Sequence, residues 1–146
     1  MGVRDSRRQK KFVSIEPGGS LRDHHLATRN IFRDLQKHLK RRGLLDSVAL
    51  INGFSFDDKA TATVSGTFGA GEVGLFIFDA DANVRRDIDA FRDKFAPGCW
   101  MVIDDYYSAT NKGAPTRIQV DELVGTGQMW PLGLYGWGTW VGRWKG

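Results

Sequence analysis

The sequence has little cysteine: Cys99 is the only one, so no disulfide can form within the chain. Proteins that lack disulfides are typical of reducing compartments, and we expect a cytoplasmic protein. Cys99 lies within an apolar run, where a cysteine usually serves as a small, buried side chain. We therefore expect Cys99 to be a core residue and not a nucleophile.

Long apolar runs are also lacking. No stretch approaches the roughly 20 apolar residues that a membrane-spanning helix needs. The first residues are basic and polar, without the apolar core of a secretory signal. With 41% hydrophobic and 26% charged residues and 4 prolines, the 146-residue chain has the composition of one globular domain. We expect no membrane association.

The formal net charge is +4 and the sequence pI is about 9.4, which raises the question of nucleic-acid binding. Basic residues near a helix C-terminus are stabilised by the helix dipole, and the acidic residues elsewhere are mixed with basic ones. A solvated face therefore explains the charge better than a nucleic-acid partner does. Much of the basic excess comes from Arg4, Arg7, Arg8, Lys10, Lys11, Lys37, Lys40, Arg41 and Arg42.

The hydrophobic pattern predicts a basic lead-in at residues 1–11 and a single α/β domain at 12–146. Apolar strands at 12–15, 47–51, 76–79 and 99–103 alternate with helices at 23–42, 84–95 and 115–124. The Trp-rich and Gly-rich tail, 127–144, predicts a closing antiparallel hairpin, whereas 59–71 fits no element. Unbroken apolar strands that alternate with helices are typical of a parallel sheet covered on both faces.

Two of the predicted strands end in paired carboxylates. Asp79 and Asp81 follow the third strand, and Asp104 and Asp105 follow the fourth. Carboxyl ends of parallel strands meet at one sheet edge, where like charges repel unless a cation or a shared proton relieves them. Carboxylate oxygens favour Mg²⁺, Mn²⁺ or Ca²⁺, so the pattern predicts a divalent-metal site.

The same acids are compatible with two alternative roles. Aspartate often caps the helix that follows a strand, although capping needs one acid per strand and not two. The triplet Asp79-Ala80-Asp81 also matches the metal motif of nucleotide-sugar glycosyltransferases. That motif is short, and it does not predict the second acidic pair.

Over residues 12–122 the chain resembles a class I S-adenosylmethionine-dependent methyltransferase. It is most similar to the metal-dependent O-methyltransferases that resemble the macrocin and aminocoumarin sugar O-methyltransferases. Catechol O-methyltransferase is a more distant relative. The resemblance is carried, in order, by Phe-Val-Ser-Ile-Glu-Pro, Gly-Phe-Ser-Phe-Asp-Asp, Leu-Phe-Ile-Phe-Asp-Ala-Asp and Ala-Pro-Gly-Cys-Trp-Met-Val-Ile-Asp-Asp-Tyr.

The resemblance implies a Rossmann-like fold, S-adenosylmethionine and Mg²⁺ as cofactors, and methyl transfer to a hydroxyl of a sugar or similar small molecule. It assigns metal ligation to Asp79, Asp104 and Asp105, and the general-base role to Asp81. A bound divalent ion lowers the pKa of the acceptor hydroxyl and orients it. The base then takes the proton, and positioning supplies most of the remaining catalysis.

The cofactor-binding residues implied by the same resemblance are Glu16, Gly53, Phe54 and Ser55. Glu16 matches the acid that binds the ribose hydroxyls, a task suited to a carboxylate because it accepts from two vicinal hydroxyls. Gly53, Phe54 and Ser55 match the turn that packs against the adenine.

One part of the family pattern does not precede Phe12: the strand and Glu-x-Gly-x-x-x-Gly turn that hold the methionine part of the cofactor. Eleven residues are too few for a strand, a turn and a helix. That strand would be central, between the first and third strands of this chain. We therefore expect an N-terminally truncated, inactive fragment. A homo-oligomer, a separate N-terminal segment and a non-catalytic α/β remnant that binds through its open sheet edge are further possibilities.

Overall fold

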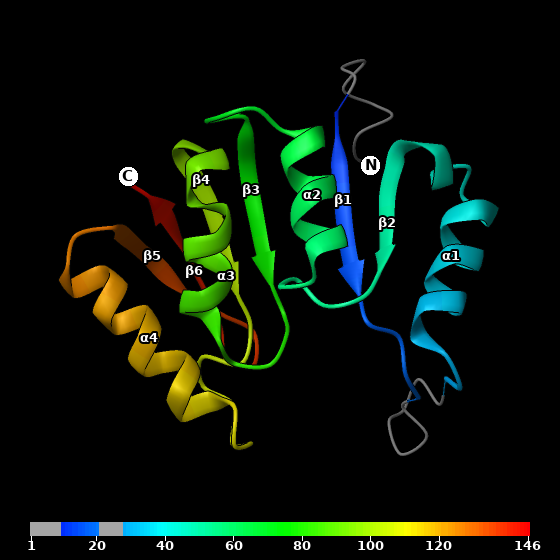
Figure 1. The fold of residues 1–146 in the computed structure, drawn as a ribbon. Coiled ribbons are helices and arrows are strands. Elements are labelled where there is room, and N and C mark those ends of the chain that lie inside the picture. Colours follow the sequence, from blue (N-terminus) through cyan, green and yellow to red (C-terminus); the bar gives the residue numbers. More distant parts are fainter. Residues whose placement is uncertain (1–9, 21–27) are drawn as a thin grey trace. The chain divides into compact units, whose positions relative to one another are not determined.

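The computed structural model describes residues 10–20 and 28–146, which form two compact units, 1–67 and 68–146 (Figure 1). Each unit is described by itself. Most of the basic lead-in and the predicted start of the first helix, 23–27, lie outside the described residues.

The first unit contains two parallel strands and two helices. β1 (Phe12–Glu16) pairs with β2 (Val48–Asn52) so that the two strands end together, with Glu16 opposite Asn52. α1 (Ile31–Arg41) and the 3₁₀ turn η1 (Leu45–Ser47) connect them. The two predicted strands are confirmed. The helix predicted over 23–42 is too long at its start, because residues 28–30 are not helical and the Asn30 side chain caps α1.

α2 (Asp58–Thr67) is the element that the hydrophobic pattern did not place. Its threonine hydroxyls bond back to the preceding turn: Thr63 donates to the Lys59 carbonyl and Thr67 to the Thr63 carbonyl, both at 2.7 Å. These bonds satisfy residues that otherwise disfavour a helix. Only Ala60 and Val64 are buried, so the apolar stripe is too narrow to be seen in the sequence.

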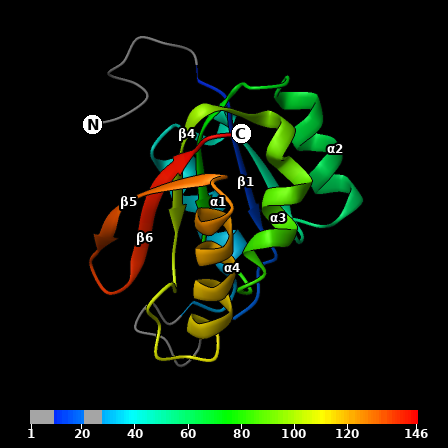
Figure 2. The same ribbon diagram turned by 90° about the vertical axis from the view of Figure 1, so that its left-hand side faces the viewer.

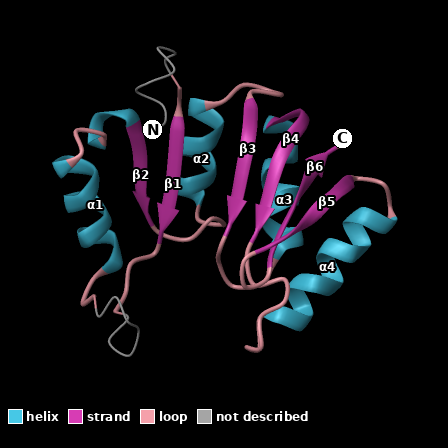
Figure 3. Cartoon of the chain, turned by 180° about the vertical axis from the view of Figure 1, so that it is seen from behind, coloured by secondary structure: helices cyan, strands magenta, loops and turns pink. Residues whose placement is uncertain are grey.

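The second unit is a four-stranded sheet with two helices. The strand order is β3-β4-β6-β5; β3 and β4 are parallel, and the remaining pairs are antiparallel (Figure 3). This confirms a parallel α/β arrangement closed by a C-terminal hairpin. The elements are β3 (Val73–Phe78), α3 (Val84–Phe91), η2 (Arg92–Lys94), β4 (Phe95–Ile103), α4 (Gly113–Gly125), β5 (Met129–Tyr135) and β6 (Thr139–Trp144).

The predicted helix over 84–95 is too long. α3 ends at Phe91, and Phe95 is the first residue of β4. The Phe95 ring lies 5.1 Å from that of Phe76 and 5.5 Å from that of Trp144, so strand packing accounts for its burial. The predicted break at 96–98 lies inside β4, where Gly98 adopts a φ of +75° that the strand accommodates.

The core of the second unit lies on one face of its sheet. Met101 and Ile103 of β4 are fully buried, as are Ile88 of α3 and Val120 and Leu123 of α4. Figure 2 shows both helices on the same side of the strands. Alternate strand residues therefore face this helical layer, as expected for a period of two.

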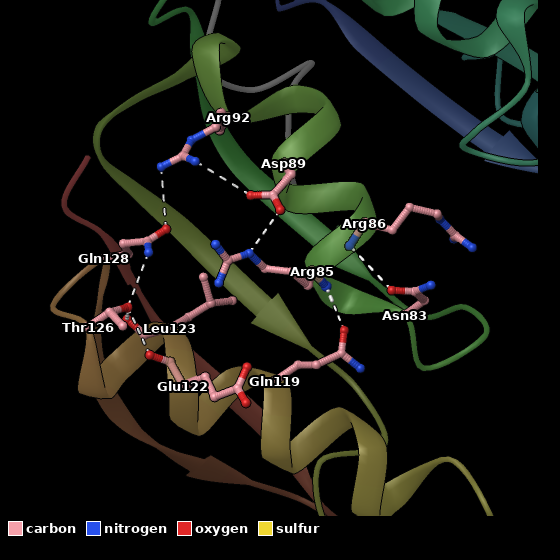
Figure 4. Close-up of polar contacts among 10 residues, drawn as sticks. All are labelled: Asn83, Arg85, Arg86, Asp89, Arg92, Gln119, Glu122, Leu123, Thr126 and Gln128. Carbon is pink, nitrogen blue, oxygen red and sulfur yellow. Dashed lines mark hydrogen bonds and ion pairs between the residues drawn. The ribbon is translucent and has the colours of Figure 1, made fainter.

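Polar contacts join α4 to α3 and to the loop before it (Figure 4). The Gln119 side chain accepts from the Arg85 backbone N–H at 2.9 Å and donates to the Ala82 carbonyl at 2.8 Å. Ala82 has a φ of +71°, unusual for a residue with a Cβ. Gln119 thus stabilises the end of the loop that begins with Asp79.

Within the described part of the chain, β1 and β3 are edge strands of their own sheets. These are the two strands between which the resemblance places a further strand. No described helix is long and apolar enough to cross a membrane.

Replacement of a side chain by alanine should lower the free energy of unfolding by different amounts on the two faces of the second sheet. Met101→Ala removes a fully buried side chain and should lower the free energy of unfolding by about 2–5 kcal/mol. Ile77→Ala, at a residue 64% exposed, should cost less than about 1 kcal/mol. Urea unfolding followed by circular dichroism measures both changes. Equal losses would contradict the assignment of the core to one face.

Candidate functional site

The carboxyl ends of β3 and β4 lie side by side and bring Asp79 next to Asp104. The Asp104 backbone N–H donates to the carbonyl of Phe78 at 2.9 Å, which continues the β3–β4 ladder by one residue. One Asp104 carboxylate oxygen accepts from the Thr139 hydroxyl of β6 at 2.7 Å. Three strands therefore fix the position of this carboxylate.

Asp105 follows in a left-handed backbone conformation, with a φ of +57°. This conformation is uncommon for residues with a Cβ, although aspartate tolerates it better than most. The Asp105 carboxylate lies 3.5 Å from the ammonium of Lys112, the residue before α4. A Cβ added at Gly113 would lie 2.0 Å from the Ser108 carbonyl oxygen, so the loop between Asp105 and Lys112 needs glycine there to close.

The charges at this edge act on one another. Partial removal from water raises the pKa of Asp79 above its usual value, and the negative charges of Asp104 and Asp105 raise that pKa further. Lys112 opposes these effects. The edge therefore favours a cation, and Lys112 supplies one positive charge.

Asp81 is oriented differently from the other three acids. Its two carboxylate oxygens accept from Arg86 at 2.8 and 3.1 Å, and one also accepts from the Asn83 backbone N–H at 3.2 Å. The hydrogen bonds from Arg86 are the main cause of a lowered Asp81 pKa. Asp81 thus orders the turn that leads into α3.

None of the four aspartates caps a helix. The Asn83 side chain caps α3 by accepting from the Arg86 backbone N–H, and α4 begins after Lys112 without a side-chain cap. The helix-capping role predicted as an alternative for the acidic pairs is therefore wrong. The acids are held by strand pairing, by Thr139 and by two basic side chains.

As placed, the carboxylates do not form a closed set of ligands. Among residues 10–20 and 28–146, no group of three or more His, Cys, Asp and Glu side chains is close enough together to hold a metal ion. Asp104 and Asp105 are near enough to Asp79 to raise its pKa, and the carboxylate oxygens of all three are hard donors of the kind that Mg²⁺ selects.

Tyr106 follows the acidic pair but is engaged by α4. Its hydroxyl donates to the Asp121 carboxylate at 2.6 Å, and burial together with this carboxylate raises its pKa to about 12. The Tyr107 ring packs edge-on against the Tyr106 ring, with 5.1 Å between the ring centroids. The Arg117 guanidinium carbon lies 5.4 Å from the centroid of the Tyr107 ring.

In the first unit, the predicted cofactor residues lie at the carboxyl ends of β1 and β2. The Glu16 carbonyl accepts from the Gly53 backbone N–H at 3.3 Å, so the two residues are adjacent. The Glu16 carboxylate accepts from the Gly18 backbone N–H at 2.9 Å. Sequence-predicted residues from two strands thus meet at one sheet edge.

The turn after β2 depends on glycine at position 53. A Cβ there would lie 2.6 Å from an Asp57 carboxylate oxygen, and that oxygen accepts from the Phe54 backbone N–H at 2.7 Å. Phe54 is 51% exposed and stacks on Phe56 with 5.1 Å between ring centroids. Ser55 lies between Phe54 and Phe56 in the sequence.

Four residues of the site are not visible as candidates in the sequence: Lys112, Thr139, Gln119 and Arg86. Lys112, Thr139 and Arg86 contact the acids from the loop before α4, from β6 and from α3. Gln119 of α4 instead bonds to the end of the loop that begins with Asp79. All four residues are polar and lie in stretches that are polar or that alternate polar and apolar residues. Only the alternation of β6 gives a signal, because it places Thr139 and Trp140 on opposite faces.

No protein-family model and no curated protein matches the chain. Solved structures do match. They include a methyltransferase from Geobacter sulfurreducens at 17% identity and TM-score 0.64, covering 93% of this chain and 59% of that one. An O-methyltransferase from Bacillus cereus in complex with SAH matches at 12% identity and TM-score 0.60, covering 93% and 63%. TomG from Streptomyces achromogenes, an O-methyltransferase of tomaymycin synthesis in complex with SAM, matches at 14% identity and TM-score 0.63, covering 93% and 62%.

The chain thus spans about 60% of the length of these solved proteins. At identities this low, the likeness establishes the fold alone. That fold is the mixed α/β, Rossmann-like fold of class I S-adenosylmethionine-dependent methyltransferases.

Proposed function

We propose that the chain belongs to an enzyme that transfers the methyl group of S-adenosylmethionine to a hydroxyl of a small molecule, such as a sugar. The observation that carries the proposal is the pair of carboxylate-bearing edges. Asp79, Asp104 and Asp105 follow β3 and β4, and Glu16 is the last residue of β1. Ligands of open α/β sheets bind beyond the carboxyl ends of the strands.

The cofactor half of the proposal rests on the first unit. The Glu16 carboxylate would accept from the two ribose hydroxyls, and the Phe54 ring would pack against the adenine. One Glu16 carboxylate oxygen accepts a hydrogen bond from the Gly18 N–H, and this bond orients the carboxylate. Gly53 and Ser55 would shape the turn between these two contacts, with Gly53 required by its approach to Asp57.

We propose a divalent cation, Mg²⁺ first, as the second cofactor. Carboxylate oxygens are donors of the kind that Mg²⁺ prefers. The Asp79 pKa is raised first by burial and then by the negative charges of Asp104 and Asp105, which a cation would relieve. Asp79, Asp104 and Asp105 would hold the ion. When bound, such an ion lowers the pKa of an acceptor hydroxyl and orients it. Lys112 would then leave Asp105, since both cations need the same carboxylate.

Asp81 is proposed as the general base. Its carboxylate is exposed, and it can accept a proton only when the pair with Arg86 opens. The pair also keeps Asp81 ionised, because the Arg86 hydrogen bonds lower its pKa. Arg86 would therefore hold the base in its ionised state until the acceptor arrives.

Replacement of Glu16 tests the cofactor site. Glu16→Gln keeps an acceptor for Gly18 but removes the charge, so S-adenosylmethionine should bind about 10-fold to 100-fold more weakly. Titration calorimetry measures the affinity. Glu122→Gln, on exposed α4, is the matched control and should bind as the wild type does. Binding of a nucleoside diphosphate sugar in place of S-adenosylmethionine would refute the proposal and favour a glycosyltransferase.

Replacement of Asp104 tests the metal site. Asp104→Asn keeps an acceptor for Thr139 but removes a charged ligand, so Mn²⁺ should bind at least about tenfold more weakly. Electron paramagnetic resonance counts the free Mn²⁺ ions. Asp89→Asn, at an exposed aspartate paired with Arg85 and Arg92, should leave the affinity unchanged. Equal affinities for all three proteins would rule out a role for Asp104 in metal binding.

A third pair of variants tests whether Asp81 acts as the general base or only as the ion-pair partner of Arg86. If Asp81 is the base, Asp81→Asn should lower methyl transfer by about 10²-fold to 10⁴-fold. Arg86→Gln leaves the base in place and should lower the rate much less. In the full-length enzyme to which the chain is proposed to belong, transfer from labelled S-adenosylmethionine to catechol and sugar hydroxyls measures both rates. Equal losses in the two variants would show that the ion pair, and not the base, is what the reaction needs.

A further inference from the structure

Lys112 brings a positive charge to the sheet edge that carries Asp79, Asp104 and Asp105. Its ammonium lies 3.5 Å from the Asp105 carboxylate. Its charge also acts on Asp79: burial and then Asp104 raise the pKa of Asp79, whereas Lys112 lowers it. One ammonium therefore acts on two of the three carboxylates of the proposed metal site. An ammonium and a divalent ion are attracted to this edge for the same reason, its negative charge.

A series of hydrogen bonds fixes the backbone of Lys112 relative to Asp105. The Ser108 N–H donates to the Asp105 carbonyl at 3.2 Å. The Ser108 and Thr110 hydroxyls bond to each other at 2.7 Å, and the Thr110 hydroxyl accepts from the Lys112 N–H at 3.3 Å. The Lys112 carbonyl accepts from the Thr116 N–H, in the first turn of α4, at 3.0 Å. The loop thus keeps the start of the lysine side chain near the acids.

The Lys112 side chain is held much less firmly than its backbone. It is 42% exposed, and the Asp105 side chain is 28% exposed. An ion pair this accessible to water contributes little to stability, so breaking it costs little. A lysine has a flexible four-carbon stem and a strongly hydrated head, so the ammonium can move away while the loop stays folded.

We propose that Lys112 is a tethered counter-ion, which occupies the acidic edge until a divalent ion displaces it and which thereby lowers the affinity of the edge for that ion. This inference rests on the metal site proposed above. It accounts for the open arrangement of the carboxylates in the described part of the chain, because an Asp105 that pairs with Lys112 does not complete a set of three ligands.

The exchange favours divalent over monovalent cations. A monovalent ion would replace one positive charge by another, whereas a divalent ion adds a charge where Asp79, Asp104 and Asp105 repel one another. A divalent ion also coordinates several oxygens at once in a defined geometry. Because Lys112 is part of the chain, it competes at the high effective concentration of a tethered group, and only an ion with these advantages displaces it.

Binding of Mn²⁺ to variants of Lys112 tests the proposal. Lys112→Met removes the charge and keeps most of the stem, so Mn²⁺ should bind about threefold to tenfold more tightly than it binds to the wild type. Lys112→Arg keeps a cation that can pair with Asp105, so its affinity should stay close to that of the wild type. Electron paramagnetic resonance of free Mn²⁺, with the full chain at one ionic strength, measures the affinities.

Lys145→Met is the matched control, because it removes the same charge from the other end of β6. Thr139 begins β6 and bonds to Asp104, whereas Lys145 follows Trp144, the last residue of that strand. The replacement should leave the Mn²⁺ affinity unchanged. Equal gains in affinity for Lys112→Met and Lys145→Met would show an effect of net charge alone and would overturn the proposal.

Nuclear magnetic resonance follows the displaced lysine directly. In protein that carries ¹³C at the lysine Cε atoms, the Lys112 signal is the one that Lys112→Met removes. It should shift when Mg²⁺ saturates the chain, because the ammonium loses its carboxylate partner, and the Lys145 signal should not. A Lys112 signal that stays in place while Mg²⁺ binds would overturn the proposal.

The outcomes separate this proposal from the metal site on which it rests. If Asp104→Asn weakens Mn²⁺ binding but Lys112→Met does not strengthen it, the metal site stands and the role of Lys112 is overturned. If neither the wild type nor any variant binds Mn²⁺, the metal site itself is wrong, and this proposal is overturned with it.

Discussion

The parallel pairing of β3 with β4 is the constraint on which the candidate site depends. Its last hydrogen bond, from the Asp104 N–H to the Phe78 carbonyl, holds two carboxylate-bearing strand ends together at 2.9 Å. Without that register Asp79 and Asp104 would avoid each other, since like charges repel. Burial and, after it, the charge of Asp104 raise the pKa of Asp79, and Lys112 offsets part of this rise. The proposed metal site follows from this imposed crowding.

The same rule of strand ends organises the first unit. Glu16 and Gly53 meet because β1 and β2 are parallel and end together, not because they are close in sequence. The two units thus use one geometric device, a sheet edge where backbone pairing stops and side chains become available to a ligand.

The two faces of the second sheet differ in how deeply their side chains are buried. On one face Met101 and Ile103 are fully buried by α3 and α4. On the other, Trp100 and Arg143 are held in position but remain accessible. Period-two alternation places Trp100 and Met101 in one strand, so a single sequence run serves a core and a surface at once.

The sequence by itself determined the α/β class, most strands, the helices at α3 and α4 and the location of the acids at strand ends, because these depend on local periodicity. It did not determine the end of α3 or the existence of α2, where tertiary packing of Phe95 and back-bonded threonines overrides the local pattern. Only the tertiary structure decided which acids act together. Asp79 faces Asp104, whereas Asp81, two residues away, pairs with Arg86. The physical reason is that a carboxylate's environment depends on how the chain turns after each strand and on which other strands lie beside it. Sequence spacing shows neither.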